Sequence, residues 1–214
     1  MFMLSRAYIL SPHRLPSPPH AIFSFQGDYS RALMSRFEDN VNSSVRLTGA
    51  APEPAVALSE AHAAVRLPGS STACVAIVRP DGALRVVNVG DSGLQVWRRK
   101  RPLNATVAMP LRIDEAAKLW SAVATASITT HGFNFPRQLA ADAAISDSVS
   151  DGAVTDFKLE GGELLIAASD GIWDNLDDNA IRTVLSRFDF EPCHALTRMA
   201  PRAQRQSARP RVWH

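Results

Sequence analysis

Residues 164–175, with the sequence LLIAASDGIWDN, join an apolar run to two carboxylates, Asp170 and Asp174. The end of a strand is a rigid position from which a scaffold can hold a charged ligand group. Gly171 lets the backbone turn directly after Asp170 and approach whatever that carboxylate binds. Because Mg²⁺ and Mn²⁺ prefer carboxylate oxygens, this segment predicts a metal ligand at Asp170.

An alternative interpretation of the same segment is a strand followed by an ordinary Asp-Gly turn. In that case Asp174 or Asn175 caps the helix that comes next. For this segment taken alone the turn is the commoner arrangement, so the rest of the chain has to decide between the two interpretations.

Two helices are expected in the first third of the chain. Over residues 28–41, every fourth residue from Tyr29 to Val41 is apolar, which gives one stripe along a helix. Residues 54–65 are rich in alanine and begin with Pro54, which is favourable in a first helical turn. Both helices therefore precede the segments that are expected to form strands.

The remaining segments predict a cluster of strands. Short loops between apolar, β-branched runs indicate antiparallel neighbours. Because the strands cluster rather than alternate with helices, the expected fold class is α+β with antiparallel sheets. The expected strands are 71–78, 84–89 and 94–98, then a β-hairpin of 154–159 and 163–168, and further helices are expected over 113–123 and 175–187.

Composition restricts the function classes that fit. The chain has 214 residues, 46% hydrophobic and 21% charged, so one domain can bury a substantial core. A formal net charge of +2 gives no indication of a nucleic-acid partner. Cys74 and Cys193 form no CxxC pair and have no metal-binding spacing, which favours a reducing compartment. No apolar run approaches the ~20 residues that a membrane-spanning helix needs.

The two ends of the chain differ in composition from the middle. Residues 1–27 contain arginines, serines and prolines but no acidic residue, so they predict a leader that is disordered or resembles a transit peptide. Residues 191–214 carry five arginines and, beyond Glu191, no acidic residue, so they predict a basic, disordered tail. The folded domain is therefore expected over residues 28–190.

Two further polar segments are candidates for chemistry. Gly90-Asp91-Ser92-Gly93 places a carboxylate between two expected strands. If the two strand ends are neighbours, Asp91 could contribute its charge to the same metal site as Asp170. His131 lies in the unusual loop HGFNFPRQL, residues 131–139, where it could act as an acid–base group or a metal ligand. Each segment can equally be an ordinary turn or loop.

Several familiar catalytic motifs are missing from the sequence. There is no Gly-x-Ser-x-Gly, no His-Glu-x-x-His and no paired catalytic Cys and His, so serine and zinc hydrolases fit poorly. Gly69-Ser70-Ser71-Thr72-Ala73 precedes a strand and lacks the lysine of a P-loop, which argues against nucleotide binding by that route.

The order of these segments resembles the metal-dependent protein phosphatases of the PP2C family, in particular their PTC7-like branch, which has organellar members. The resemblance covers roughly residues 28–187. The matching segments are Gly69 to Ala73, Asn88-Val89-Gly90-Asp91-Ser92-Gly93, residues 131–139, residues 168–175 (ASDGIWDN) and the first helix around Asp28-Tyr29-Ser30-Arg31-Ala32-Leu33-Met34.

The resemblance implies a fold and a mechanism. The fold is a sandwich of two antiparallel sheets with helices on both outer sides. In the implied mechanism, two Mg²⁺ or Mn²⁺ ions about 3.5–4 Å apart activate a water that hydrolyses a phosphoprotein monoester. By residue matching Asp170 is a metal ligand, and no side chain is implied as a direct catalyst. The residues implied to support the site are Asp91, Gly171, Asp174 and Asn175.

The chain also departs from the family pattern. The family carries an Asp-Gly-x-Gly-Gly motif before its first helix and an aspartate-bearing strand near its end. Neither pattern is found before Asp28 or after Phe190. One metal ligand, Asp170, then remains of the usual set, and the domain is expected to be incomplete.

Close cations repel unless a bridging carboxylate offsets the repulsion. The ion pair is therefore not expected to form in this chain, and weak or no phosphatase activity is predicted. The alternatives are a non-catalytic PP2C-like module that binds a phosphoprotein or another partner, and a generic α+β binding domain whose motifs are fortuitous.

Overall fold

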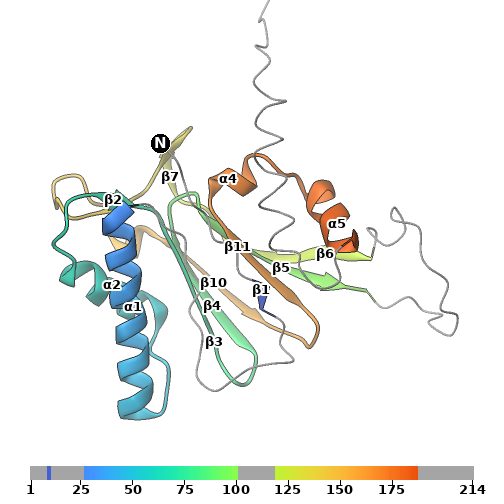
Figure 1. The fold of residues 1–214 in the computed structure, drawn as a ribbon, viewed down its shortest axis with the longest axis horizontal. Helices are drawn as coiled ribbons and strands as arrows, with labels where there is room; N and C mark the ends of the chain where they lie inside the picture. The colour runs from blue at the N-terminus through green and yellow to red at the C-terminus, as the bar shows by residue number, and fades with distance from the viewer. Residues whose placement is uncertain (1–8, 11–26, 101–118, 188–214) are drawn as a thin grey trace, which may run out of the picture.

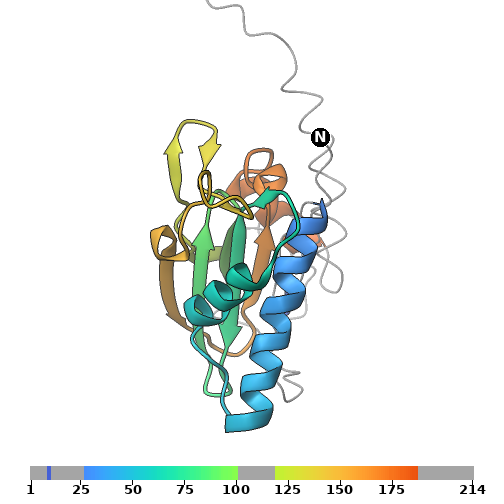
Figure 2. The same ribbon diagram turned by 90° about the vertical axis from the view of Figure 1, so that its left-hand side faces the viewer.

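The computed structural model describes residues 9–10, 27–100 and 119–187. Two antiparallel sheets pack face to face, with helices on the outer side of each (Figure 1). This arrangement confirms the α+β class that the strand pattern predicts and the sandwich that the PP2C resemblance implies. The first outer layer consists of α1 (Gly27–Thr48) and α2 (Pro54–Ala64), which lie in front of their sheet in Figure 2. The second contains α4 (Asp170–Trp173) and α5 (Asp178–Arg187).

Each sheet is built from strands that come from distant parts of the chain. The first has the order β10 (Ala153–Lys158), β4 (Ala83–Val89), β3 (Ala73–Val78). The second has the order β1 (Ile9–Leu10), β11 (Leu164–Ala168), β5 (Gly93–Arg99), β6 (Trp120–Thr125). The smaller elements are the pair β2 (Ser70–Ser71) and β9 (Leu139–Ala140), the hairpin β7 (Thr130–Gly132) and β8 (Phe135–Pro136), and the 3₁₀ turn η1 (Val149–Asp151).

The alternation of side chains along the strands builds the core in three layers. In β3, Val75 and Ile77 pack against the helices α1 and α2, while Cys74 and Ala76 face the other sheet. Strand β11 behaves in the same way, because its successive residues contribute alternately to the layer between the sheets and to the layer under α5. Cys74 is a free thiol, fully enclosed between the sheets.

The first helix follows the predicted stripe and continues beyond it. The predicted stripe residues Tyr29, Leu33, Phe37 and Val41 are all buried, as is Met34. The helix extends to Thr48, past the end predicted from the stripe. The residues after Val41 are mostly polar, so the apolar period could not reveal this last part.

The predicted hairpin of 154–159 and 163–168 is wrong. Strand β10 pairs with β4, and β11 pairs with β5, so the turn at 160–162 crosses from one sheet to the other. Buried Glu163 fixes this crossing, since its carboxylate accepts a hydrogen bond from Arg98 Nε at 2.6 Å and one from the Glu160 N–H at 2.8 Å. A short loop between two apolar runs fits a connection between stacked sheets as well as a hairpin.

Strands β4 and β5, expected as neighbours in one sheet, also lie in different sheets. Gly90 starts this second crossing with φ +109°. A Cβ atom at this position would lie 2.4 Å from Thr72 Cγ2 and 2.8 Å from the carbonyl oxygen of Arg137. The crossing therefore needs glycine for its backbone conformation and for its close packing.

Two predicted helix boundaries are also wrong. A helix was expected over 113–123, but residues 120–125 form strand β6, which pairs with β5. Residues 113–118 lie outside the described residues. The spacing of apolar residues there fits the period of a helix as well as that of a strand. Pairing with the edge of β5 makes this segment a strand.

The helix expected from residue 175 begins instead at Asp178. Neither Asp174 nor Asn175 caps it: Asp174 ends α4, and the Asp177 side chain accepts a hydrogen bond from the Ala180 N–H. Four acidic or amide residues lie close together, at 174, 175, 177 and 178, and all could serve as caps. Packing of the helix on the sheet selects among them.

The predicted leader and tail lie mostly outside the described residues. Within 1–27, Ile9–Leu10 forms β1 and pairs with β11, so these two residues belong to the sheet rather than to a disordered leader. The tail 191–214 lies outside the described residues. Among the helices that the structure describes, none combines the length and the apolar character needed to cross a membrane.

Replacing Gly90 by alanine should destabilise the fold by about 2–5 kcal/mol. Alanine is strained at the positive φ of this residue, and its Cβ would clash with the backbone of Arg137. Urea denaturation measures the change. Gly132→Ala is the matched control, because nothing lies within 4 Å of a Cβ there. Equal stability of the two variants would contradict the role given to Gly90.

Candidate functional site

Asp170 follows the end of β11 after one residue, Ser169, and begins the short helix α4. Its Oδ1 accepts a hydrogen bond from the Gly171 N–H at 2.7 Å, and its carbonyl oxygen accepts one from the Asp174 N–H at 2.8 Å. Trp173 anchors the turn, because its Nε1 donates to the carbonyl oxygen of Ala168 at 2.8 Å. Asn175 Nδ2 closes it by donating to the carbonyl oxygen of Gly171 at 3.2 Å.

The β11–β5 pairing brings a second carboxylate to this corner. Ala168 is the register partner of Gly93, so the crossing that carries Asp91 lies beside the end of β11. Burial raises the pKa of Asp91, and the negative charges of Asp170 and Asp174 raise it further. Burial and the Asp170 charge likewise raise the pKa of Asp174. The structure thus brings together the three aspartates that the sequence singled out.

This acidic corner, defined by Asp91, Asp170 and Asp174, fits a hard cation in the type of its donor atoms. The three aspartates do not, however, form a group that could hold a metal ion. In the described parts of the chain, no group of three or more His, Cys, Asp and Glu side chains could hold a metal ion. Burial first, and then repulsion from the neighbouring carboxylates, raises the pKa of both Asp91 and Asp174, so protons offset part of the negative charge.

Asn88, a buried polar residue of β4, holds the crossing that presents Asp91. Its Nδ2 donates to the carbonyl oxygens of Ser92 at 2.6 Å and of Ser127 at 3.0 Å. The hydroxyls of Thr72 and Ser92 are 2.9 Å apart, so Thr72 also helps to hold this crossing. Asn88 had no predicted role, although a lone amide within an apolar strand was a signal for one.

The loop of His131 forms the β7–β8 hairpin, which stands clear of the sandwich in Figures 1 and 2. His131 Nε2 lies 3.0 Å from Asp147 Oδ2, and Arg137 Nη1 donates to Asp147 Oδ1 at 2.8 Å. Burial alone would raise the pKa of Asp147, but the Gln138 N–H, His131 and Arg137 together hold it below its usual value. The His131 imidazole is thus engaged by a carboxylate, and Asp147 is a residue that the sequence analysis missed.

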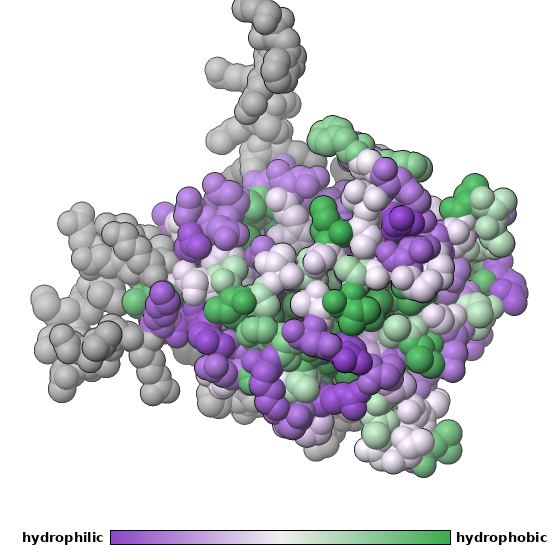
Figure 3. All heavy atoms as spheres, turned by 180° about the vertical axis from the view of Figure 1, so that it is seen from behind, coloured by the Kyte–Doolittle hydropathy of each residue, from purple (hydrophilic) through white to green (hydrophobic). Residues whose placement is uncertain are grey.

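The hairpin exposes apolar side chains at its tip. Phe133 is fully exposed, and Phe135 has 64% of its surface exposed. Green, hydrophobic spheres project from the upper edge of the molecule in Figure 3. The base of the hairpin is tied to the Gly90 crossing, since the Thr129 N–H donates to the carbonyl oxygen of Gly90 at 2.8 Å.

Several curated relatives of the chain are protein phosphatases. It is 31% identical over 159 residues to the probable protein phosphatase 2C 80 of Arabidopsis thaliana, covering 74% of this chain and 33% of the relative. It is 35% identical over 120 residues to the protein phosphatase PTC7 homolog fig of Drosophila virilis, covering 53% of this chain and 32% of the relative. The chain therefore spans about a third of the length of these relatives. No protein-family model matches it.

Solved structures share the fold. The photosystem II phosphatase PBCP matches with a TM-score of 0.66 and 22% identity, over 94% of this chain and 80% of that chain. The serine/threonine phosphatase of S. agalactiae matches with a TM-score of 0.52 and 15% identity, over 94% of both chains. The catalytic domain of the serine/threonine phosphatase PstP, solved with 2 manganese ions, matches with a TM-score of 0.50 and 14% identity, over 94% and 92%.

At these identities the solved structures establish the fold. The family relationship rests on the sequence identity to the curated relatives. The chain belongs to the PP2C family of protein phosphatases, and PTC7 homologues are among its relatives.

Proposed function

We propose that the chain is part of a metal-dependent serine/threonine protein phosphatase, with Asp170 as a ligand of Mg²⁺ or Mn²⁺ and a phosphoprotein monoester as substrate. The observation that supports this most directly is the acidic corner, held at the ends of β11 and the β4–β5 crossing in a chain of PP2C kinship. Asp91, Gly171, Asp174 and Asn175 support the site by shaping its charge and its turn.

We further propose that this corner does not assemble two metal ions without additional ligands. A bound ion pair would supply charge neutralisation and an activated water. Ions that close need several carboxylates to offset their repulsion, and the described residues offer no group of three ligands. The residues of this chain therefore hold and orient one carboxylate, Asp170, and surround it with negative charge.

The lack of a group of three metal ligands among the described residues also favours a second candidate function. This is a non-catalytic PP2C-like module that binds a phosphoprotein or another partner. In this case the sandwich is retained as a binding scaffold, and the projecting β7–β8 hairpin is one of its exposed features. The two candidates differ in whether metal binding and turnover depend on Asp170.

Phosphatase activity tests whether the site in this chain is incomplete. With Mn²⁺ and a phosphoserine peptide, we expect release of phosphate near background, because one ligand cannot hold the reactive ion pair. Asp170→Asn should leave this low rate unchanged, as should the exposed control Asp39→Asn on α1. Robust turnover that Asp170→Asn abolishes and Asp39→Asn preserves would overturn the proposal of an incomplete site.

Metal titration by calorimetry provides an independent measurement. We expect no tight pair of Mn²⁺ sites and at most one weak site, with a dissociation constant of about 1 mM or higher. Asp170→Asn should weaken that site at least about tenfold, a loss of about 1.4 kcal/mol, whereas Asp39→Asn should not. Two micromolar sites would contradict the expectation.

We propose a mitochondrial or plastid location, on the basis of the PTC7-like branch and the acid-free composition of residues 1–27. A fluorescent protein fused behind residues 1–27 should be imported into one of these organelles. Replacing Arg6 and Arg14 with glutamate should abolish the import. A diffuse signal from the unaltered fusion would reject the location.

A further inference from the structure

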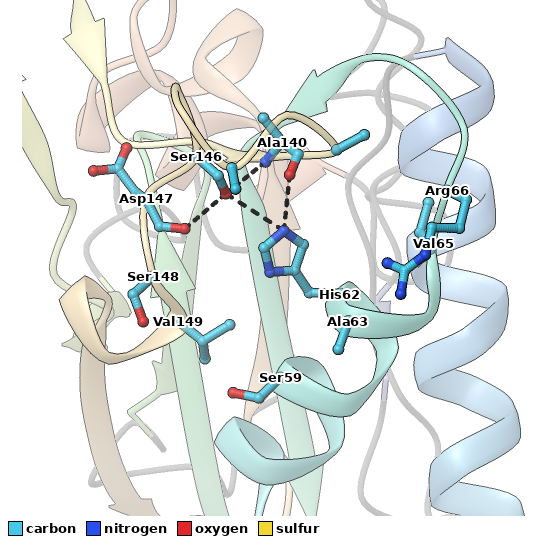
Figure 4. Close-up of a pocket in the computed structure, with 12 residues that line it drawn as sticks. Ser59, His62, Ala63, Val65, Arg66, Ala140, Ser146, Asp147, Ser148 and Val149 are labelled. Atoms are coloured by element: carbon cyan, nitrogen blue, oxygen red, sulfur yellow. Dashed lines mark hydrogen bonds between the residues drawn. The ribbon is translucent and has the colours of Figure 1, made fainter.

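A pocket of about 410 Å³ lies away from the acidic corner, between the C-terminal turn of α2 and the loop that follows β9 (Figure 4). Its volume falls within the range of about 300–1,000 Å³ that is usual for small-molecule sites. Six of the residues that line it are polar or charged: Ser59, His62, Arg66, Ser146, Asp147 and Ser148.

The charge that faces this pocket is positive. Arg66 is exposed, and within the described residues its guanidinium makes no ion pair and no hydrogen bond. Figure 4 shows this side chain turned toward the pocket. The acidic residue of the lining, Asp147, directs its carboxylate away from His62 and toward Arg137 and His131, which bind it. The guanidinium is thus a cation at the rim of the pocket that has no partner among the residues the structure describes.

His62 and two serines supply further polar groups. His62 Nε2 lies 3.0 Å from the carbonyl oxygen of Ala140, which can only accept, so Nε2 carries the hydrogen and donates it. The Ser59 hydroxyl has no hydrogen-bond partner among the described residues. Ser59 and His62 are three positions apart on α2, which places them on one helix face, and Arg66 follows just beyond the helix end.

We propose that this pocket binds a phosphate monoester, with Arg66 as its principal contact. A guanidinium presents a planar fork of donors that matches the oxygens of a phosphate group. The Ser59 hydroxyl can donate to a further oxygen of a tetrahedral anion. The Ser148 hydroxyl lies 2.8 Å from that of Ser150 and can donate to the anion when Ser150 is the donor in that pair. The space exceeds a phosphate group alone, so the ligand has a body attached to it, either a phosphorylated side chain or a free small molecule.

The surroundings also set the expected strength of binding. The C-terminal end of α2 faces the pocket, and the negative end of a helix opposes an anion. Part of this effect is removed, since the Val65 N–H is bonded to the carbonyl oxygens of Ala61 and His62. An exposed Arg66 adds the entropic cost of being ordered. A dissociation constant of about 1 mM follows for the phosphate group.

Backbone ¹H–¹⁵N NMR of the full chain, with EDTA present to exclude metal at the acidic corner, tests the site. O-phosphoserine should shift resonances of residues 59–66 and 140–149 saturably. A phosphoserine peptide and glucose 6-phosphate then distinguish a protein-borne from a free monoester, and acetate tests for a carboxylate. Because metal is absent, the result does not depend on the proposed phosphatase function.

Arg66→Ala should weaken binding at least about tenfold and Ser59→Ala about threefold. Arg46→Ala, an exposed arginine on α1, is the matched control and should bind as the parent chain does. Unchanged binding by Arg66→Ala, equal binding of acetate, shifts that do not saturate, or shifts centred on Asp170 would each overturn the proposal.

Discussion

Most of the structure depends on the burial of both faces of the central strands. Strands β3 and β11 send alternate side chains into the layer between the sheets and into a layer under helices, so neither face can be left to solvent. Apolar burial contributes roughly 25 cal/mol for each Å² removed from water, and here both sides of a strand contribute. Two sheets and two outer helical layers are a compact way to satisfy that constraint.

The same constraint explains which elements the sequence could predict. A stripe such as Tyr29 to Val41 is a local pattern, and it located α1 correctly. The pairing of β10 and β11 is not local, because an apolar strand carries no mark of the sheet to which it belongs. Loop length alone could not distinguish a hairpin from a connection between the two sheets. The hydrogen bond from Arg98 to Glu163 that fixes this connection joins residues far apart in sequence.

The candidate site was predicted in part. The order of motifs drew attention to Asp91, Asp170 and Asp174, which the fold brings together through the register of Ala168 with Gly93. Asn88 and Asp147 were missed, since their importance lies in carbonyl and side-chain partners that only the folded chain supplies. Kinship to PP2C phosphatases replaces the generic binding domain as an explanation of the motifs. The chain belongs to the family, but the described residues supply too few metal ligands for a two-ion site. Family membership therefore does not imply catalytic activity here.

The free Cys74 has a consequence for the chemistry of the interior. Its thiol lies between the two sheets, and burial raises its pKa to about 12. A thiol with that pKa is almost entirely protonated in the cell, and only the thiolate reacts readily with oxidants or alkylating agents. The sandwich therefore shields Cys74 as long as its sheets stay together. Any reaction at this sulfur records that the two sheets have separated, which makes Cys74 an internal reporter of opening.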